Sequence, residues 1–331
     1  MTNQKPTVCV LARESPAHYK ELDYEIIGRN FPCTVHQYNY DPQNILRFIA
    51  LMRETDVLVS WFANPWLAVI WPLIRKKPKL AIIAGGYDVA DCPELNYGHQ
   101  HRPILKQLGH SILSSADDIL TISDFSREEL LRFAKPKATQ TIYCAVDFCE
   151  FSVLKTTPRK NQVITIGAME NFISRRKGHF RFVEVAKKMP NTHFLLAGKP
   201  VDDTIDRLKA MAPPNLEIRG FLSREELLQE LLASKVYLQL SHHEGFGLSA
   251  IEAVACGCYP VVANNTALTE VTLNQGYTVD GGDIDGAVNA IQVALDQDLH
   301  MEIESGSIAE HFSVERREEG LVRAIQSLAD A

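Results

Sequence analysis

Short apolar runs alternate with longer segments of helical periodicity along most of the sequence. The apolar runs contain few interspersed polar residues, which is typical of strands that helices cover on both faces. This order predicts an α/β protein with parallel sheets. In the first half, strands are expected at 6–12, 34–40, 57–62, 80–86, 118–123 and 141–146.

Helices are expected between these strands. Ser126 is followed three residues later by Glu129, and Ser223 by Glu226, so each pair has the pattern of a capping box at a helix start. The expected helices of the first half are 17–31, 44–54, 66–77, 103–116 and 125–134.

The alternation pauses after Phe151. Residues 152–162 are polar and contain a proline and several cationic side chains, a composition typical of a linker. Beyond it, strands are expected at 163–169, 193–198, 216–220, 236–241 and 259–264, and helices at 178–189, 223–234, 247–257, 283–297 and 314–330.

The chain is therefore expected to contain two Rossmann-like domains, 1–151 and 163–312, joined by this linker. Residues 313–331 are expected to form a helix that returns to the first domain. Because α/β sheets bind ligands at the carboxyl ends of their strands, the two parallel sheets are expected to face a binding cleft between the domains.

Composition narrows the possible functions. The 331 residues are 46% apolar and 23% charged, as in ordinary globular proteins, and the net charge of −7 gives no positive field that would attract nucleic acid. No signal-peptide pattern and no membrane-spanning apolar run is visible, so a cytoplasmic protein is expected. The seven cysteines include no C-x-x-C pair and are expected to be reduced thiols, with no metal site.

The stretch after the expected strand 236–241 carries the clearest functional signal. Gly245 and Gly247 predict a tight turn before a helix that begins at about Leu248. The backbone amides of Phe246, Gly247, Leu248 and Ser249 would then point out of the positive end of that helix, where phosphate groups commonly bind.

Two glutamates flank this predicted anion site. Glu244 precedes the glycines, and Glu252 lies roughly 7 Å further along the helix at about 1.5 Å per residue. A carboxylate repels phosphate, but it can accept hydrogen bonds from hydroxyl groups on either side of a diphosphate. The layout predicts a nucleotide sugar or a dinucleotide, unless Glu244 is only a loop charge and Glu252 only a solvated helix residue.

An NAD-dependent Rossmann enzyme is one alternative. Residues 245–250 fit the dinucleotide pattern G-x-G-x-x-G/A between a strand and a helix. That pattern also requires an acidic residue about twenty positions further on, where this chain has Asn264 and Asn265.

The same stretch resembles the retaining GT-B glycosyltransferases of family 4, whose E-x7-E motif Glu244 and Glu252 match. "RRKGHFRFVEVAKKMP" resembles the family's Lys-Gly segment, and "IRGFLSREELLQELLASKVYLQLS" resembles its donor-base region. The likeness is strong over 160–290 and weak over the first 80 residues. It implies that Glu244 contacts the donor sugar and that Glu252 holds the ribose.

The resemblance also implies a basic pair that neutralises the leaving diphosphate. Lys177, before Gly178, matches the family lysine. Where the family often has its arginine, this chain has Ala168, so Arg176, or failing that Arg175, is expected to supply the second charge.

The acceptor half departs further from the family. Many members have a histidine in a turn after the fourth strand, where this chain has Tyr87 followed by Asp88. Asp88 is expected to orient the acceptor hydroxyl, or else the turn is purely structural. The family's glycine-rich turn after the first strand is replaced by Arg13 and Glu14.

Residues 61–77 combine three tryptophans with a basic end. A core helix of the first domain is expected here, and the alternative is a peripheral contact with the cytoplasmic face of a membrane, near a lipid-linked acceptor.

With the predicted anion site, the resemblance to family 4 implies a retaining, metal-independent hexosyltransferase without a cofactor. It would move a hexosyl unit from a UDP- or GDP-linked sugar to an acceptor sugar or lipid-linked glycan. The alternative is a homologue that binds a nucleotide sugar without turnover.

Overall fold

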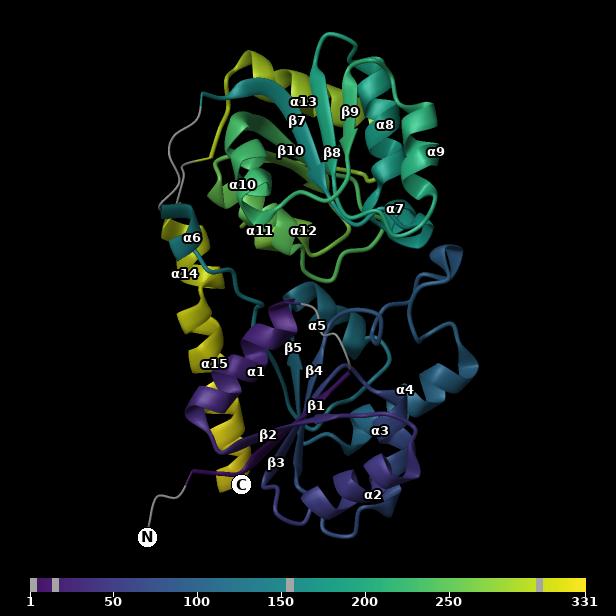
Figure 1. Ribbon diagram of the computed structural model, residues 1–331, viewed down its shortest axis with the longest axis vertical. Helices are drawn as coiled ribbons and strands as arrows, with labels where there is room; N and C mark the ends of the chain where they lie inside the picture. The colour runs from purple at the N-terminus through teal and green to yellow at the C-terminus, as the bar shows by residue number, and fades with distance from the viewer. Residues whose placement is uncertain (1–4, 14–17, 153–157, 302–305) are drawn as a thin grey trace. The chain divides into compact units, whose positions relative to one another are not determined.

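The computed structural model describes residues 5–13, 18–152, 158–301 and 306–331. The chain divides into two compact units, one of Met1–Ala145 with Val314–Ala331 and one of Val146–Ser313 (Figure 1). The described residues of each unit form a six-stranded sheet whose strands all pair in parallel. The predicted α/β class with parallel sheets is confirmed.

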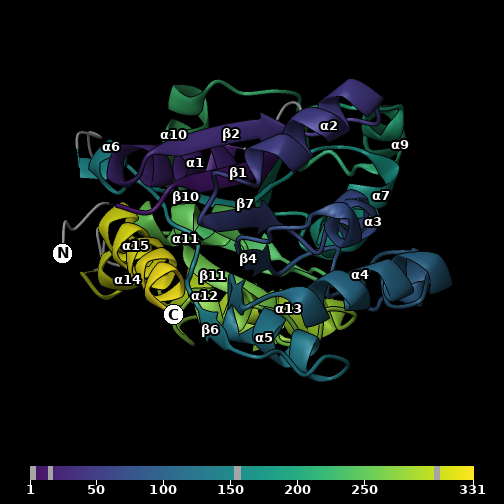
Figure 2. The ribbon, with the colours of Figure 1, turned by 90° about the horizontal axis from the view of Figure 1, so that it is seen from below.

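The sheet of the first unit has the strand order β2-β1-β3-β4-β5-β6. Helices α2, α3 and α4 cover one face, and α1 and α15 cover the other (Figure 2). The strands are β1 (Val8–Ala12), β2 (Cys33–Gln37), β3 (Val57–Trp61), β4 (Lys79–Ala84), β5 (Asp118–Thr121) and β6 (Thr139–Thr141). The helices are α1 (His18–Asn30), α2 (Pro42–Leu51), α3 (Pro65–Ile70), η1 (Trp71–Leu73), η2 (Pro93–Leu95), α4 (Pro103–Ser115), α5 (Asp124–Leu131) and α15 (Val314–Asp330).

The last helix is bound to the first unit by a buried ion pair. Arg317 donates through Nε (2.7 Å) and Nη2 (2.6 Å) to the two carboxylate oxygens of Asp23 on α1, and their side chains are 2% and 0% exposed. Its Nη1 donates to the carbonyl oxygens of Ile142 (2.6 Å) and Tyr143 (2.9 Å). One guanidinium therefore joins α15, α1 and the segment after β6.

The second unit has the order β12-β11-β10-β7-β8-β9. Helices α8, α9 and α13 contribute to the core on one face, and α10 and α11 pack on the other. The strands are β7 (Lys160–Ile166), β8 (His193–Ala197), β9 (Leu216–Arg219), β10 (Ser234–Gln239), β11 (Tyr259–Ala263) and β12 (Tyr277–Val279). The helices are α6 (Cys149–Ser152), α7 (Asn171–Lys177), α8 (His179–Lys188), α9 (Thr204–Met211), α10 (Arg224–Ala233), α11 (Leu248–Ala255), α12 (Leu268–Val271), α13 (Ile284–Asp296) and α14 (Gly306–Phe312).

The strand order of the second unit indicates where a ligand would bind. Counted from β7, it is the doubly wound order 3-2-1-4-5-6, which reverses between β7 and β10. In such sheets ligands bind outside the carboxyl ends of the two strands at this reversal. The loop that follows β10 is the one that carries the glycine turn.

Several local predictions need correction. The predicted strand 141–146 is wrong, because β6 ends at Thr141 and the next carbonyl groups accept from Arg317 instead of a neighbouring strand. The predicted capping box at Ser126 is also wrong, since α5 begins at Asp124 and the Ser123 hydroxyl accepts from the amide of Ser126 at 3.0 Å. The capping box at Ser223 is confirmed.

Boundaries differ as well. The predicted helix 66–77 ends early, because Pro72 cannot donate the next helical hydrogen bond. Of the predicted linker, 160–162 belong to β7, where buried Gln162 donates to Ser234 Oγ at 2.9 Å, and 153–157 lie outside the described residues. Strand β12 and helix α9 were not predicted.

The tryptophans of segment 61–77 lie in the core, as expected. Trp61, Trp66 and Trp71 are 4–5% exposed. Within the described ranges, no helix has the length and apolarity that crossing a membrane requires.

Candidate functional site

The loop between β10 and α11 contains the predicted glycine turn. Gly247 has φ 108°, a left-handed conformation that favours glycine, and it precedes the first turn of α11. The helix begins at Leu248, so the first amides, including that of Ser249, point out of its positive end. Gly245 and Phe246 are buried. The turn is therefore built as predicted, with helix-start amides at the β10 end of the sheet.

A second corner of the chain packs against this loop. Gly178 joins α7 to α8 with φ 81°, and a Cβ there would lie 2.2 Å from the carbonyl oxygen of Leu240. The amide of His242 donates to the carbonyl oxygen of Arg176 (2.8 Å), and Arg176 Nη1 donates to that of His243 (2.9 Å). Because only glycine permits this approach, the Lys-Gly pattern fixes where the basic side chains lie.

Arg176 and Lys177 converge on Glu244. Arg176 Nη1 lies 3.4 Å, and Lys177 Nζ 3.8 Å, from Glu244 Oε2, which also accepts from Gln239 Nε2 at 3.1 Å. The three charged side chains are 12–17% exposed, so they are largely shielded from solvent but still accessible to a ligand. Arg175, the alternative partner, is exposed. The structure therefore brings Arg176 to the glutamate, together with Lys177.

The charges of this group influence one another. Burial raises the pKa of Glu244, but Arg176 and Lys177 outweigh burial, so its pKa lies below the usual value. Burial lowers the pKa of Lys177, and Arg176 adds to this effect while Glu244 opposes it. An anion that entered here would compete with Glu244 for two cations that are already held together.

The second glutamate of the motif has a cationic neighbour. Glu252 lies in the second turn of α11, and its Oε1 accepts from Arg224 Nη1 at 2.7 Å. Arg224 is the first residue of α10, and its guanidinium lies 5.8 Å from the centre of the Phe151 ring. Sequence reasoning missed Arg224, because only the fold brings the start of α10 to α11.

Two polar residues of β10 were also missed. The Tyr237 hydroxyl donates to Gln239 Oε1 (2.6 Å) and lies 2.9 Å from Ser249 Oγ, while Gln239 Nε2 donates to Glu244. Burial raises the pKa of Tyr237, which keeps it a neutral donor. Tyr237 and Gln239 share a face of β10, and Ser241, two residues beyond, continues the alternation, a signal that the sequence did contain.

His179, the first residue of α8, is fully buried. Its Nδ1 lies 3.0 Å from Ser174 Oγ, and its Nε2 has no hydrogen-bond partner in the part of the chain that the structure describes. Burial, together with Lys177 and Arg176 nearby, lowers the pKa of His179 to about 3. A neutral imidazole therefore lies close to the cation pair.

Asp88 lies in the first unit, in the turn after β4. Its carboxylate accepts from the backbone amides of Ala63 (3.0 Å), Gly86 (3.1 Å) and Gly85 (3.3 Å), and the residue is 0% exposed. Burial raises its pKa against the opposing effect of these amides. The predicted contact with an acceptor hydroxyl does not fit this geometry, because the turn already uses both oxygens. Asp88 instead fixes the turn to the end of β3.

Tyr87, which stands where the family has its histidine, is half-buried. Its ring packs edge-on against Tyr97 and His99, at centroid distances of 5.2 and 5.1 Å, and Arg102 lies 5.6 Å from its centre. The ring therefore belongs to an aromatic packing group. Of the pair expected after β1, Arg13 is exposed and Glu14 lies outside the described residues.

Histidine, cysteine and acidic side chains are the usual protein ligands of metal ions. Over the described ranges, no group of three or more histidine, cysteine or acidic side chains is placed to hold a metal ion. The seven cysteines are free, and burial raises the pKa of Cys258 to about 12.

The site lies in a segment that known proteins share. A family model, Glycosyl transferases group 1, matches residues 151–307. This group 1 segment contains both motif glutamates and the cation pair. Among curated proteins, the chain is 30% identical to O-antigen chain mannosyltransferase B of Escherichia coli over 233 residues, which are 64% of this chain and 60% of that protein. It is 28% identical to D-inositol 3-phosphate glycosyltransferase of Mycobacterium sp. (strain KMS) over 260 residues, 72% of this chain and 56% of that protein.

The chain thus spans less than two thirds of the length of these relatives. Among solved structures, Anabaena Alr3699/HepE in complex with UDP and glucose superposes with a TM-score of 0.78 at 14% identity, covering 97% of this chain and 100% of that one. Sucrose-phosphate synthase from Thermosynechococcus elongatus gives 0.70 at 16%, covering 98% and 96%. The two Rossmann-like units have the GT-B fold.

Proposed function

We propose that the chain is a retaining glycosyltransferase of the family 4 type, which moves a hexosyl unit from a UDP- or GDP-linked sugar to a sugar or lipid-linked acceptor. One observation carries the proposal: Arg176, Lys177 and Glu244 converge beside the start of α11, at the strand reversal between β7 and β10. The match to the group 1 model and the likeness to a mannosyltransferase support it.

In this proposal the donor diphosphate lies against the helix-start amides of Leu248 and Ser249. Arg176 and Lys177 bind its charge, and Glu244 turns from these cations to the hydroxyl groups of the sugar. Glu252 accepts from the ribose hydroxyls while Arg224 continues to neutralise it. The two glutamates thereby take the opposite ends of the donor, as their spacing along the sequence suggests.

The reaction would proceed by attack of the acceptor oxygen on the face that the diphosphate leaves. The bond between the anomeric carbon and the phosphate oxygen breaks, and its electron pair goes to the diphosphate. The acceptor oxygen forms the new bond, and its proton passes to the departing phosphate. Fixed cations and amides stabilise this developing negative charge without having to reorganise. No side chain of the protein acts as a nucleophile.

Metal independence is part of the same proposal, because the cation pair supplies positive charge where a metal ion would otherwise serve. Transfer should therefore continue at an unchanged rate after extensive treatment with a chelator. A loss of rate that Mg²⁺ or Mn²⁺ restores would overturn this part.

The test of function compares two neighbouring cations. Lys177→Ala should lower turnover of the nucleotide sugar by about 100- to 1,000-fold, the usual cost of removing one group that stabilises transition-state charge. Arg175→Ala is the matched control, and it should keep the rate within about twofold, as surface changes usually do.

The assay measures release of UDP or GDP from a panel of nucleotide sugars, with thermal shift to report binding of each nucleotide. Nucleotide binding without any turnover would favour the non-catalytic homologue. Equal rates in the two variants would remove Lys177 from the mechanism.

A further inference from the structure

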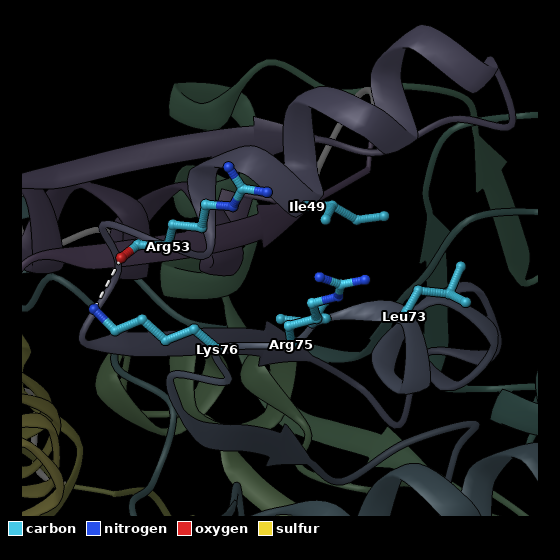
Figure 3. A pocket seen from close by; sticks show the side chains of 6 residues that line it. Ile49, Arg53, Leu73, Arg75 and Lys76 are labelled. Carbon is cyan, nitrogen blue, oxygen red and sulfur yellow. Dashed lines mark hydrogen bonds between the residues drawn. The ribbon is translucent and has the colours of Figure 1, made fainter.

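A basic surface with exposed aliphatic side chains lies in the first unit, before the amino ends of β3 and β4. Its centre is a cavity of about 350 Å³ (Figure 3). Side chains from α2, from η1 and from the segments before β3 and β4 line this cavity, namely Ile49, Arg53, Leu73, Ile74, Arg75 and Lys76.

The cations of this surface are open to a ligand. Arg53 and Arg75 are exposed, and within the described part of the chain neither guanidinium has an ion-pair or hydrogen-bond partner. Lys76 Nζ donates to the carbonyl oxygen of Arg53 at 3.0 Å, which holds it at the rim of the same cavity. Residues 41–79 contain six cationic and three acidic side chains, whereas the whole chain has a net charge of −7.

Aliphatic side chains border these cations on two sides. Leu46 and Ile49 are three residues apart on α2 and lie on one stripe of that helix, and Arg53 follows in the turn after it. Leu46 is 67% exposed. On the other side, Leu73 of η1 is 58% exposed and Val69 of α3 is 57% exposed. Figure 3 shows Ile49 above the guanidinium of Arg75 and Leu73 to its right.

We propose that this surface docks on an anionic lipid bilayer. Leu46, Val69 and Leu73 would enter the boundary between headgroups and acyl chains, and the cations would bind the lipid phosphates. The exposed apolar side chains are complementary to the acyl chains of such an interface. The cations, which have no ion-pair partner among the described residues, are complementary to its phosphates.

The alternative polyanion, RNA, fits less well. Binding of single-stranded RNA typically combines cations with aromatic side chains on which bases stack. Here Trp66 and Trp71 are buried in the core, and the exposed apolar side chains are aliphatic. The inference goes beyond the proposed transferase activity, and its test needs no turnover.

Co-sedimentation with vesicles tests the proposal. The protein should sediment with mixed phosphatidylglycerol and phosphatidylcholine vesicles, should remain in solution with phosphatidylcholine alone, and should be released by salt. The triple variant Arg53→Gln, Arg75→Gln, Lys76→Gln should bind about 100-fold more weakly, at roughly fivefold for each cation removed.

A matched control makes the same change of charge elsewhere. Arg132, Lys135 and Lys209 are exposed, and replacing all three by glutamine should leave vesicle binding unchanged. The pair Leu46→Ser and Leu73→Ser should weaken binding even at low salt, which a purely electrostatic surface would not show.

Two outcomes would overturn the proposal. One is that the unmodified protein fails to sediment with anionic vesicles. The other is that the triple variant and the control triple sediment alike. Binding of polyuridylate through Arg53, Arg75 and Lys76, without vesicle binding, would replace the membrane by RNA. Tryptophan fluorescence in urea checks that each variant keeps the first unit folded.

Discussion

In the first unit, Asp88 lies after β4 with three backbone amides on its carboxylate, whereas in the second unit Glu244 lies after β10 beside two cationic side chains. Both are acids that follow strands of a parallel sheet. The difference is in the partners, because backbone amides belong permanently to the fold, whereas in the proposed function Arg176 and Lys177 exchange Glu244 for the donor diphosphate. Buried charge in the first unit is held by the fold itself, whereas in the second unit it has the arrangement that the proposed function assigns to donor binding.

The largest expected effect concerns the structural role of buried charge in the first unit, and the buried pair of Arg317 and Asp23 tests it. Replacing Arg317 by methionine leaves Asp23 buried without a counterion and should cost about 3–5 kcal/mol of stability. All three tryptophans lie at 61–71, so the urea midpoint by tryptophan fluorescence reports the first unit alone.

The control is Arg29→Met, which breaks the pair of Arg29 with Glu318 on the same two helices. The Arg29 side chain is 50% exposed, so this change should cost less than about 1 kcal/mol. Equal losses in the two variants would contradict the structural role of the buried pair.

A second check exchanges the two acids for alanine. Glu244→Ala should reduce turnover by about 100-fold, as removal of a group that acts in the transition state does, while UDP or GDP binding is kept. Asp88→Ala should instead lower the stability of the first unit by about 1–3 kcal/mol, because buried amides lose their acceptor.

Turnover and the fluorescence midpoint are measured on both variants. The contrast fails if Asp88→Ala abolishes turnover without a change of midpoint, or if Glu244→Ala lowers nucleotide binding as much as turnover.

The smallest expected effect is a pH dependence that comes from His179. Its pKa falls from 6.5 to about 3 on folding, so below pH 6.5 the unfolded chain binds a proton that the folded chain excludes. Stability should be complete above pH 6.5 and should fall as the pH drops, by about 2 kcal/mol between pH 7 and pH 5.

His179→Asn removes this titration, so the free energy of unfolding of the second unit should depend less on pH in the variant. Circular dichroism in urea measures this free energy at each pH. Burial also lowers the pKa of His36, His99 and His110, but these lie in the first unit. The tryptophan signal should thus keep its own pH dependence in the variant, and a change there instead would contradict the assignment.

Much of the second unit could be predicted because single residue types carry its geometry. Gly178 and Gly247 occupy left-handed positions, and the glycine pattern marks both corners of the site. Arg224 could not be found in this way, because its contact with Glu252 depends on how two helices pack. For Asp88 the residue was found but its role was not, since a sequence does not show which amides a turn directs inward.

The same limit applies to β6. The apolar residues 142–146 have the sequence pattern of a strand, but Arg317, 175 residues further along the chain, binds the carbonyl group of Ile142. Local pattern therefore predicts elements whose partners are near in sequence or repeat regularly, and it fails where a single distant side chain supplies the partner.

The return of α15 to the first unit has a consequence for how the chain is made. During synthesis α15 leaves the ribosome only after the whole of residues 146–313. Until then the first unit lacks Arg317, whose guanidinium neutralises Asp23. The second unit, by contrast, is contiguous and can fold as soon as it emerges. The order of folding is therefore the reverse of the order of synthesis. The first unit begins to be synthesised first but is the last to complete its native packing.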